Sequence, residues 1–408
     1  MSEIKILRKL AQEYYRCAMD PVNMKRMELH RAVNDLNMQR PIVLIDEIPW
    51  HELNFDGSLT NRCKDPLFQE AETYFRRKLF QWKYFPADMI LPPFFAVYKV
   101  INDSGIGIKV EESTLDTASG GGNIVSHAYI DQLATDEDIE KIHLPVITYD
   151  KEATFAKYTK IAEAIGDVIP VRIVGRGCYC SPWDNIASYR GVENILIDLI
   201  EEPERTHRIV SKIYECETSK YQQLEEQGLL EINQYALHCT SCLNSELGKD
   251  YDGTNVLRKH IWGRGMAQVF SSVGKDMHEE FDIEYMKKFM EPFGLNYYGC
   301  CEPLDRKMDI VEKLPNLRKV SITPWADVDI AAEAINTKYV LSNKPNPAQV
   351  SMELNEDALR EELGRTLAAI KRNHCNSELV LKDISSAGNN VQNLIRWEKI
   401  AMEMVNSY

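Results

Sequence analysis

Residues 295–346 read LNYYGCCEPLDRKMDIVEKLPNLRKVSITPWADVDIAAEAINTKYVLSNKPN, and the pattern of this segment indicates the fold class. Its three short apolar runs, Leu295–Tyr298, Lys319–Ile322 and Tyr339–Leu341, have the length of buried strands. An amphipathic stretch, Asp327–Asn336, lies between the second and third runs and begins at an Asp, as helices often do. Short buried strands that alternate with helices are typical of a parallel sheet.

The same alternation extends toward the amino terminus, where Pro203–Gln227 and Ile283–Phe293 have a helical pattern. With the three runs above, the chain has eight strand candidates, the others being Ile42–Ile48, Met89–Val97, Val168–Val174, Leu230–Leu237 and Met266–Val273. Eight repeats of this kind favour an α/β fold closed into a (β/α)8 TIM barrel. The short Gly263-Arg264-Gly265 sequence is assigned to a turn.

Two segments fall outside the repeats. Residues 1–40 look helical with one break at Asp20-Pro21, which predicts an N-terminal helical extension that forms a cap or the contact of a homodimer. Residues 103–145 contain Gly120-Gly121-Gly122 and few periodic apolar residues, which predicts a hairpin or lid inserted after the second strand. We therefore expect one barrel domain over residues 41–408.

Composition narrows the classes of partner. The 408 residues contain 48 Lys and Arg against 62 Asp and Glu, a formal charge of −14, which argues against nucleic acid or an anionic membrane as the main partner. No run approaches the roughly 18 apolar residues of a membrane helix, and the first ten residues are charged, so we expect a cytoplasmic protein. The ten cysteines are then reduced thiols rather than a disulfide framework.

In a barrel of this kind, chemistry takes place where strands run into their following loops. The polar, aromatic and thiol residues at the predicted strand ends are Asp46, Glu47, Trp50, His51, Arg176, Cys178, Cys180, His238, Cys239, Cys242, Ser271, His278, Glu279, Glu280, Tyr298, Cys300, Cys301, Glu302, Pro324, Trp325, Asp327, Ser342, Lys344 and Asn346. The cysteines of this set fall into three clusters, one of them beside His238.

The carboxyl-terminal half carries a family resemblance. The segments WGRGMAQVFSSVGKDMHEEF from Trp262, GLNYYGCCEPLD from Gly294, LRKVSITPWADVD from Leu317 and YVLSNKPNPAQV from Tyr339 resemble the uroporphyrinogen decarboxylase-like superfamily. The resemblance is specific over residues 165–350. It implies the barrel and three reactions: decarboxylation, methyl transfer from a corrinoid to a thiol, and methyl transfer from a substrate to a corrinoid.

Charge argues against decarboxylation. Uroporphyrinogen has eight carboxylates, and the family's decarboxylases place an Arg-rich segment after their first strand. Here that segment is DEIPWHE, residues 46–52, without Arg or Lys. An acidic mouth of this kind is expected to repel the substrate.

The ligand pattern argues against thiol methylation. The family's thiol methyltransferases hold zinc with a His-x-Cys pair after the sixth strand and a Cys after the eighth. Counting Leu295–Tyr298 as the sixth strand, this chain has Tyr298-Gly299-Cys300 there. Counting Tyr339–Leu341 as the eighth, it ends in Ser342-Asn343-Lys344-Pro345, without Cys.

The remaining reaction is methyl transfer from a small methylated aromatic substrate to the cob(I)alamin of a separate small corrinoid protein. A methyl ether has a poor leaving group, so its oxygen must be protonated or bound by a Lewis acid. The predicted catalytic residues are His238, Glu280 and Tyr298, and the predicted metal ligands, with zinc as the metal, are His238, Cys300, Cys301 and Glu302. The predicted substrate-binding residues are Asp46, Glu47, Trp50, Arg176, His278, Trp325 and Lys344.

Three alternatives stay open. The sequence His238-Cys239-x-x-Cys242 is either a ligand set or a buried pair of thiols beside a backbone-bonded His. Glu202, Glu217 and His238 match a spacing described for zinc in substrate-side methyltransferases, but Glu217 falls inside a predicted helix. The third is an alternative to methyl transfer: the protein is a decarboxylase, or a barrel that only binds a small molecule.

Overall fold

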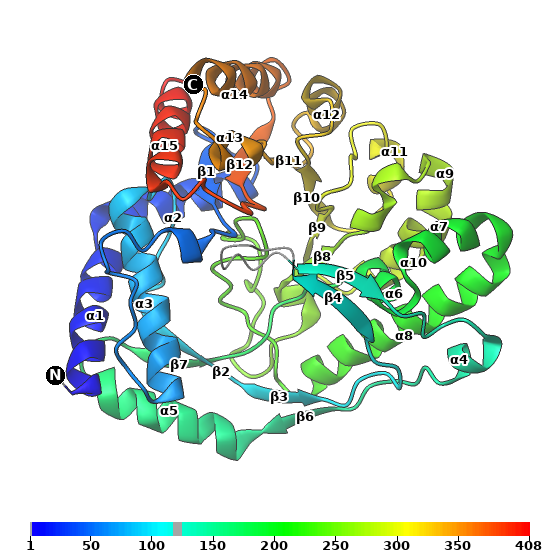
Figure 1. The fold of residues 1–408 in the computed structure, drawn as a ribbon, viewed down its shortest axis with the longest axis horizontal. Helices are drawn as coiled ribbons and strands as arrows, with labels where there is room; N and C mark the ends of the chain where they lie inside the picture. Colours follow the sequence, from blue (N-terminus) through cyan, green and yellow to red (C-terminus); the bar gives the residue numbers. More distant parts are fainter. Residues whose placement is uncertain (1, 117–124) are drawn as a thin grey trace.

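Parallel strands form the centre of the protein, and its computed structural model describes residues 2–116 and 125–408 (Figure 1). Six strands form one sheet in the order β1-β12-β11-β10-β9-β8. They are β1 (Ile42–Ile45), β8 (Trp262–Gly265), β9 (Leu295–Tyr298), β10 (Leu317–Ile322), β11 (Val340–Asn343) and β12 (Asn376–Leu381). A second parallel ladder pairs β2 (Phe95–Tyr98) with β7 (Val171–Val174).

Isolated contacts connect the two sheets. Cys180, which follows β7, forms a single parallel bridge with Gly265 of β8. On the other side, the Asp88 amide donates to the Val43 carbonyl, and the Asp88 carboxylate accepts from the Val43 amide, both at 2.9 Å. Within the described residues, 2–116 and 125–408, these contacts do not extend the two ladders into a closed barrel. The structure therefore shows an α/β fold with parallel sheets.

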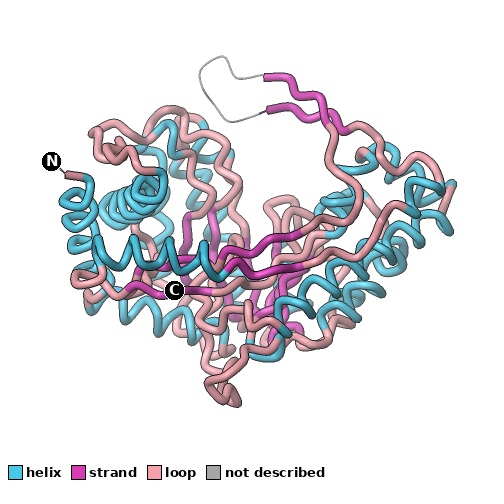
Figure 2. Tube along the Cα trace, turned by 90° about the horizontal axis from the view of Figure 1, so that it is seen from below, coloured by secondary structure: helices cyan, strands magenta, loops and turns pink. Residues whose placement is uncertain are grey.

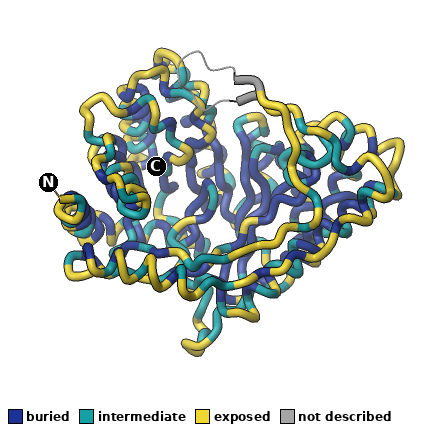
Figure 3. Tube along the Cα trace, turned by 60° about the horizontal axis from the view of Figure 1, so that its bottom comes forward, coloured by how far each residue is buried: buried dark blue, intermediate teal, exposed yellow. Residues whose placement is uncertain are grey.

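Helices surround the strands, while buried residues follow the strands through the centre (Figures 1 and 3). The helices after β1 are α3 (Pro66–Tyr84), α4 (Asp136–Glu140), α5 (Lys151–Ile165), α6 (Pro182–Arg190), α7 (Val192–Glu201), α8 (Pro203–Glu226), α9 (Lys275–His278), α10 (Glu284–Met290), α11 (Met308–Val311), α12 (Val328–Ile335), α13 (Ala348–Ser351), α14 (Glu356–Arg372) and α15 (Val391–Asn406). Short 3-10 turns are η1 (Trp50–Glu52), η2 (Arg258–His260) and η3 (Gln268–Ser272), and η4 (Glu279–Ile283) is a π turn. No helix in the described part of the chain is long and apolar enough to cross a membrane.

The amino-terminal helices pack directly on this body. α1 (Glu3–Ala18) and α2 (Pro21–Asn34) are separated at Asp20, whose carboxylate caps α2 by accepting from the Val22 amide. Apolar residues of α1 such as Tyr14 share a core with Phe75 of α3 and Ile161 of α5. α1 therefore covers the side of the protein beside β2, whereas α2 packs on β1 and β12.

The insertion consists of two antiparallel ladders. β3 (Val100–Asp103) pairs with β6 (Ile147–Asp150), and β4 (Glu112–Asp116) pairs with β5 (Val125–Tyr129). The β4–β5 hairpin stands away from the body (Figure 2). The predicted Gly120-Gly121-Gly122 segment lies outside the described residues.

Three predictions about strands are wrong. Leu230–Leu237 is irregular, because the carboxylate of Glu231 takes the amides of Gly175 and Asn233 that a ladder would use. Met266–Val273 is not a strand, and its Gln268–Ser272 part is η3. The preceding Gly-Arg-Gly sequence, assigned above to a turn, lies in β8. Its glycines are required by close packing, since a Cβ at 263 would lie 2.0 Å from the Asn296 side chain.

The sequence pattern also missed β12. Its sequence NSELVL is buried at every position, but Glu378 interrupts the apolar pattern. The Glu378 carboxylate lies 3.1 Å from the Lys319 ammonium of β10, and both side chains are fully buried. Ser342 of β11 and Ser241 also donate to this carboxylate, at 2.5 and 2.6 Å. Although burial opposes ionisation, Lys319 and Lys344 lower the pKa of Glu378 to about 2.

We expect Lys319→Met to destabilise the protein by about 3–5 kcal/mol, because it removes the ion-pair partner that lies 3.1 Å from the buried Glu378 carboxylate. Urea unfolding measures this change. Lys338→Met, which removes a lysine from a surface pair with Glu312, is the matched control and should cost less than about 0.5 kcal/mol. Equal stability of the two variants would contradict the prediction.

Candidate functional site

Four segments bring polar side chains together at the carboxyl ends of the parallel strands. Residues 46–47 follow β1, residues 300–301 follow β9, and residues 382–383 follow β12. The fourth segment is the irregular loop that contains residues 238–242. Carboxyl ends of parallel strands meet on one side of a sheet, and active sites of such folds lie there.

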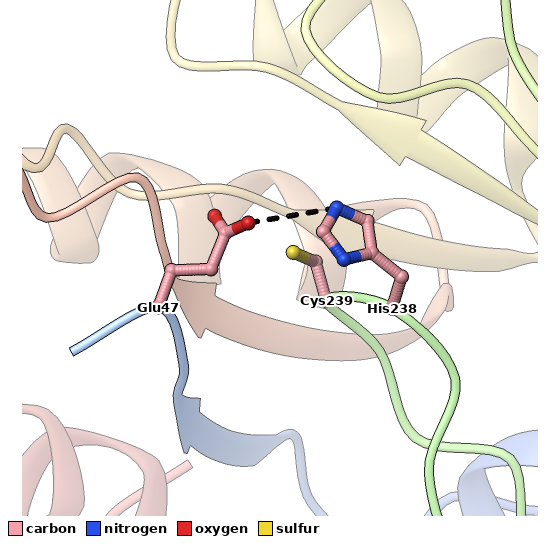
Figure 4. A group of neighbouring side chains, drawn as sticks. All are labelled: Glu47, His238 and Cys239. Atoms are coloured by element: carbon pink, nitrogen blue, oxygen red, sulfur yellow. Dashed lines mark ion pairs between the residues drawn. The ribbon is translucent and has the colours of Figure 1, made fainter. Parts of the chain in front are cut away.

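Glu47, His238 and Cys239 form the group best suited to hold a metal ion. One ligand atom from each lies within 4.8 Å of the others. The Glu47 carboxylate is 3.5 Å from His238 Nε2, and the Cys239 thiol points into the space between them (Figure 4). Glu47 comes from the end of β1, and the other two from the loop (Figure 4).

Unfavourable backbone conformations place two of these side chains. Glu47 has φ 49° and Cys239 has φ 55°, both in the left-handed region. For residues with a Cβ this conformation costs on the order of 1–2 kcal/mol, and such residues cluster at functional sites. The Asp383 amide donates to the Glu47 carboxylate at 2.9 Å, and Lys344 donates to the Cys239 carbonyl at 2.8 Å. These contacts hold the two strained residues in place.

The donor set fits zinc. Carboxylate, imidazole and thiolate are all zinc ligands, and catalytic zinc sites have three protein ligands with one position left for substrate or water. Burial raises the pKa of the Cys239 thiol, and Asp46 and Glu47 raise it further. Because zinc binds the thiolate, loading of this site would release a proton.

Cys300 and Cys301, predicted above as metal ligands, form a neighbouring group with Lys382. Their sulfur atoms are 3.7 Å apart, and the Lys382 ammonium is 3.2 Å from Cys300 and 3.5 Å from Cys301. β9 has already ended at Tyr298, so the two adjacent side chains need not face opposite ways. The Cys301 thiol lowers the pKa of Cys300, and His238, Arg264 and Lys382 lower it further against the effect of burial.

Glu302 lies beneath this group rather than in it. Its buried carboxylate accepts from the backbone amides of Ala267 at 3.0 Å and Cys300 at 2.8 Å. Burial raises the pKa of Glu302 to about 7. Its contacts therefore position the turn that carries Cys300.

His278 and Tyr298 lie together in a closed polar network. His278 Nε2 is 2.6 Å from the Tyr298 hydroxyl, which donates to Asp282 at 2.6 Å. Lys307 reaches His278 Nδ1 at 3.2 Å. Burial and Lys307 lower the pKa of His278 to about 3. Both predicted residues are fully buried, and their hydrogen bonds join β9 to the π turn.

Other predicted residues lie at more exposed places. The Glu280 side chain is 56% exposed and pairs with His207 of α8 at 3.0 Å. Trp325 is 74% exposed, and Arg176 is also exposed. Lys344 is buried and binds Ser342 and the Cys239 carbonyl. Of the predicted catalytic residues, His238 is the one that lines the cavity described next.

A cavity of about 1110 Å³ lies beside the Glu47 group. Glu47, His238, Asp46 and Trp50, four of the residues predicted at strand ends, line it. Its aromatic walls, which the sequence did not indicate, include Tyr74, Phe94, Phe95, Tyr98, Tyr179 and Tyr235. The Tyr179 and His238 rings meet edge to face with centroids 5.3 Å apart. The size and lining suit a small aromatic ligand.

The charge of this cavity differs from the prediction. Arg77 and Lys78 of α3 line the same space as Asp46 and Glu47. The acidic segment 46–52 therefore does not set the charge of the opening alone. The composition of segment 46–52 did not indicate these cations, because they lie on the next helix, α3.

Two ligand patterns can be compared with the structure. Glu202 precedes α8, and Glu217 lies within this continuous helix of 24 residues. Fifteen helical residues span about 22 Å, so Glu202 and Glu217 do not share one ion with His238. In the other pattern, Tyr339–Leu341 is counted as the eighth strand, but β12 follows it, and the residues directly after β12, Lys382-Asp383, also include no Cys.

Comparisons with known proteins give a structural likeness. No protein-family model and no curated protein sequence matches this chain. Among solved structures, the chain is similar to a methyltransferase from Methanosarcina mazei, with a TM-score of 0.50 and 10% sequence identity. The likeness covers 93% of this chain and 98% of the other. At this sequence identity, the likeness shows only that the two proteins have a similar fold.

We expect Lys382→Met to raise the pKa of Cys300, because it removes a positive charge 3.2 Å from the sulfur. Ultraviolet absorbance of the thiolate, followed against pH, measures this shift. Cys300→Ser identifies the signal, since it should abolish the low-pH step. An unchanged titration in the Lys382 variant would show that the ammonium does not stabilise the thiolate.

Proposed function

We propose that the protein is a methyltransferase of the (β/α)8 barrel type that removes a methyl group from a small aromatic methyl ether. The observation that carries the proposal is the convergence of Glu47, His238 and Cys239 beside a large aromatic cavity. The structural neighbour is a methyltransferase, which supports the same reaction class. The acceptor in this proposal is a corrinoid carried by a separate small protein, as the family resemblance implies.

The proposed function requires the parallel strands to be arranged as a barrel. The contact of Cys180 with Gly265 and that of Asp88 with Val43 lie where a barrel would join its neighbouring strands. Such a barrel has one open mouth, where a substrate in the cavity can be reached by a partner protein. The β4–β5 hairpin stands away from the body as a structure that could cover bound substrate (Figure 2).

The chain's own residues would hold and activate the substrate. Trp50 and Tyr179 provide ring faces and edges for an aromatic ether. Glu47, His238 and Cys239 would hold zinc, which supplies a Lewis acid for the departing oxygen when bound. Without metal, the His238 imidazole is the proton donor in the same position. Either role places His238 at the ether oxygen.

There are two alternatives. One is a protein that binds its ligand without catalysing a reaction, and the other is a decarboxylase. The aromatic cavity alone would serve a binding protein. Decarboxylation of uroporphyrinogen remains disfavoured, because Arg77 and Lys78 are few cations for eight carboxylates.

His238→Ala should lower demethylation of an aryl methyl ether by about 100-fold or more, because it removes the group at the leaving oxygen. The assay supplies reduced corrinoid protein and measures the phenol released. His207→Ala, on α8 and bound to Glu280, is the matched control and should retain activity. Nearly full activity of the His238 variant would remove this residue from the proposed site.

Metal analysis separates the two roles of His238. If zinc is held, His238→Ala and Cys239→Ser should both lose bound zinc, and a chelator should inactivate the wild type. If His238 acts as an acid, wild type and variants should be equally free of metal. Full zinc content in the Cys239 variant would exclude the three-residue ligand set.

The purified protein should not decarboxylate uroporphyrinogen, because its cavity has too few cations for the eight carboxylates. Product analysis after incubation with uroporphyrinogen tests this expectation. Turnover on the order of 1 per second or faster, typical of enzymes, would contradict it.

A further inference from the structure

Two adjacent thiols, those of Cys300 and Cys301, lie in contact at the end of β9. All ten cysteines of the chain are free, and the sulfur atoms of this pair are 3.7 Å apart. Adjacent side chains of a regular strand face opposite sides. Here the strand ends at Tyr298, and Gly299 turns the chain with φ 96°. The turn therefore brings both sulfur atoms to the same side.

Contacts that do not involve sulfur hold this turn. The Glu302 carboxylate accepts from the Cys300 amide at 2.8 Å, and the Cys300 carbonyl accepts from the Ser321 hydroxyl of β10 at 3.0 Å. Gly299 is required, because its φ is positive and a Cβ there would lie 2.6 Å from the Leu304 side chain. The surrounding structure thus holds two reduced thiols close together before any bond joins them.

The charges around the pair differ between the two sulfur atoms. The Lys382 ammonium is 3.2 Å from Cys300 and 3.5 Å from Cys301. The Cys301 sulfur is also 3.6 Å from the Asp383 carboxylate, which opposes a negative charge on it. Because the thiolate is the nucleophilic form of cysteine, Cys300 is the better nucleophile of the two. Cys300 is buried and Cys301 is partly exposed, so the pair suits a small reactant.

We propose that Cys300 and Cys301 are a site of reversible oxidation, at which a small hydroperoxide converts the two thiols to a disulfide between adjacent residues. The Cys300 thiolate attacks one peroxide oxygen, the O–O bond breaks, and the other oxygen leaves as an alcohol or water after taking a proton. The Cys301 thiol then loses its proton and attacks the Cys300 sulfur, and the hydroxyl of the Cys300 sulfenic acid leaves as water. Two thiols and one hydroperoxide thus give one disulfide, one alcohol or water from the peroxide, and one further water.

The covalent geometry of adjacent residues makes such a disulfide easy to reduce. Consecutive Cα atoms are about 3.8 Å apart across a trans peptide, whereas disulfides usually join Cα atoms about 4.4–6.8 Å apart. The bond between Cys300 and Cys301 would therefore be strained. Strained disulfides are more reducible than the structural disulfides of secreted proteins, and are the labile ones. A thiol reductant should reverse the oxidation by exchange.

The oxidised pair would change the charges beside the Glu47, His238 and Cys239 group. A disulfide has no thiolate to pair with the Lys382 ammonium, which would keep the Asp383 carboxylate at 2.8 Å as its partner. The Asp383 amide in turn donates to Glu47. The inference itself needs neither a metal nor a methylated substrate, so its outcome is independent of the proposed function.

Mass spectrometry of the full chain after treatment with hydrogen peroxide tests the inference. A chelator present throughout keeps metal ions away from the sulfur atoms, and iodoacetamide then blocks free thiols in denaturant. The peptide that contains Cys300 and Cys301 should be unalkylated and lighter by two hydrogen atoms. It should form at least about 10-fold faster than Cys17 is lost, since Cys17 is a partly exposed thiol on α1 and controls for exposure. Millimolar reduced glutathione should restore both thiols.

Serine variants assign the two steps. In Cys301→Ser, Cys300 should still react with peroxide but stop at the sulfenic acid, which dimedone labels. In Cys300→Ser, Cys301 should react no faster than Cys17. Cys17→Ser is the matched control and should form the disulfide at the wild-type rate. Far-ultraviolet circular dichroism of each variant before oxidation checks that it is folded.

Four results would overturn the inference. They are alkylation of both Cys300 and Cys301 after peroxide has consumed Cys17, a disulfide from Cys300 to another cysteine such as Cys239, oxidation of the pair no faster than that of Cys17, and a product that glutathione does not reduce.

Discussion

The buried pair of Lys319 and Glu378 is the interaction on which the site depends. It joins β10 to β12, and the same two side chains bind Thr240 and Ser241 of the irregular loop. Cys239 immediately precedes this anchor. A buried charge pair is stable only when its remaining hydrogen-bond positions are filled, and here hydroxyls and a carbonyl fill them. The loop is therefore fixed to the strands without being a strand itself.

This anchoring explains how strained residues persist at the mouth. The left-handed conformations of Glu47 and Cys239 are unfavourable in isolation. Contacts from Lys344 and from the Asp383 amide, both at strand ends, compensate for them. The Glu47 side chain thereby links the segment after β1 to the segment after β12. A change in the buried network would reach the proposed metal ligands through these contacts.

The sequence could predict strands made of apolar residues, but not strands that contain buried charged residues such as those of this network. Leu295–Tyr298 is an apolar run, and the structure has a strand at these residues. β12 and β8 were missed because buried Glu378 and Arg264 make their sequences look unlike strands. Local pattern cannot show that a charged residue has a partner two strands away. His238 was predicted as a candidate because it follows an apolar run, but its grouping with Glu47 depends on contacts between distant segments.

The charge at the cavity also depends on contacts between distant segments. The segment 46–52 contains three acids and no Lys or Arg, so its composition alone predicts an opening that repels anions. In the structure, Glu52 accepts from the amides of Ala387 and Asn389, and Glu47 from that of Asp383. Carboxylates bound to backbone donors attract a cation less than free carboxylates do. The helix after that segment adds Arg77 and Lys78, together with Glu70, to the lining of the cavity. What a ligand meets is the charge left after internal pairing, and only the folded arrangement determines it.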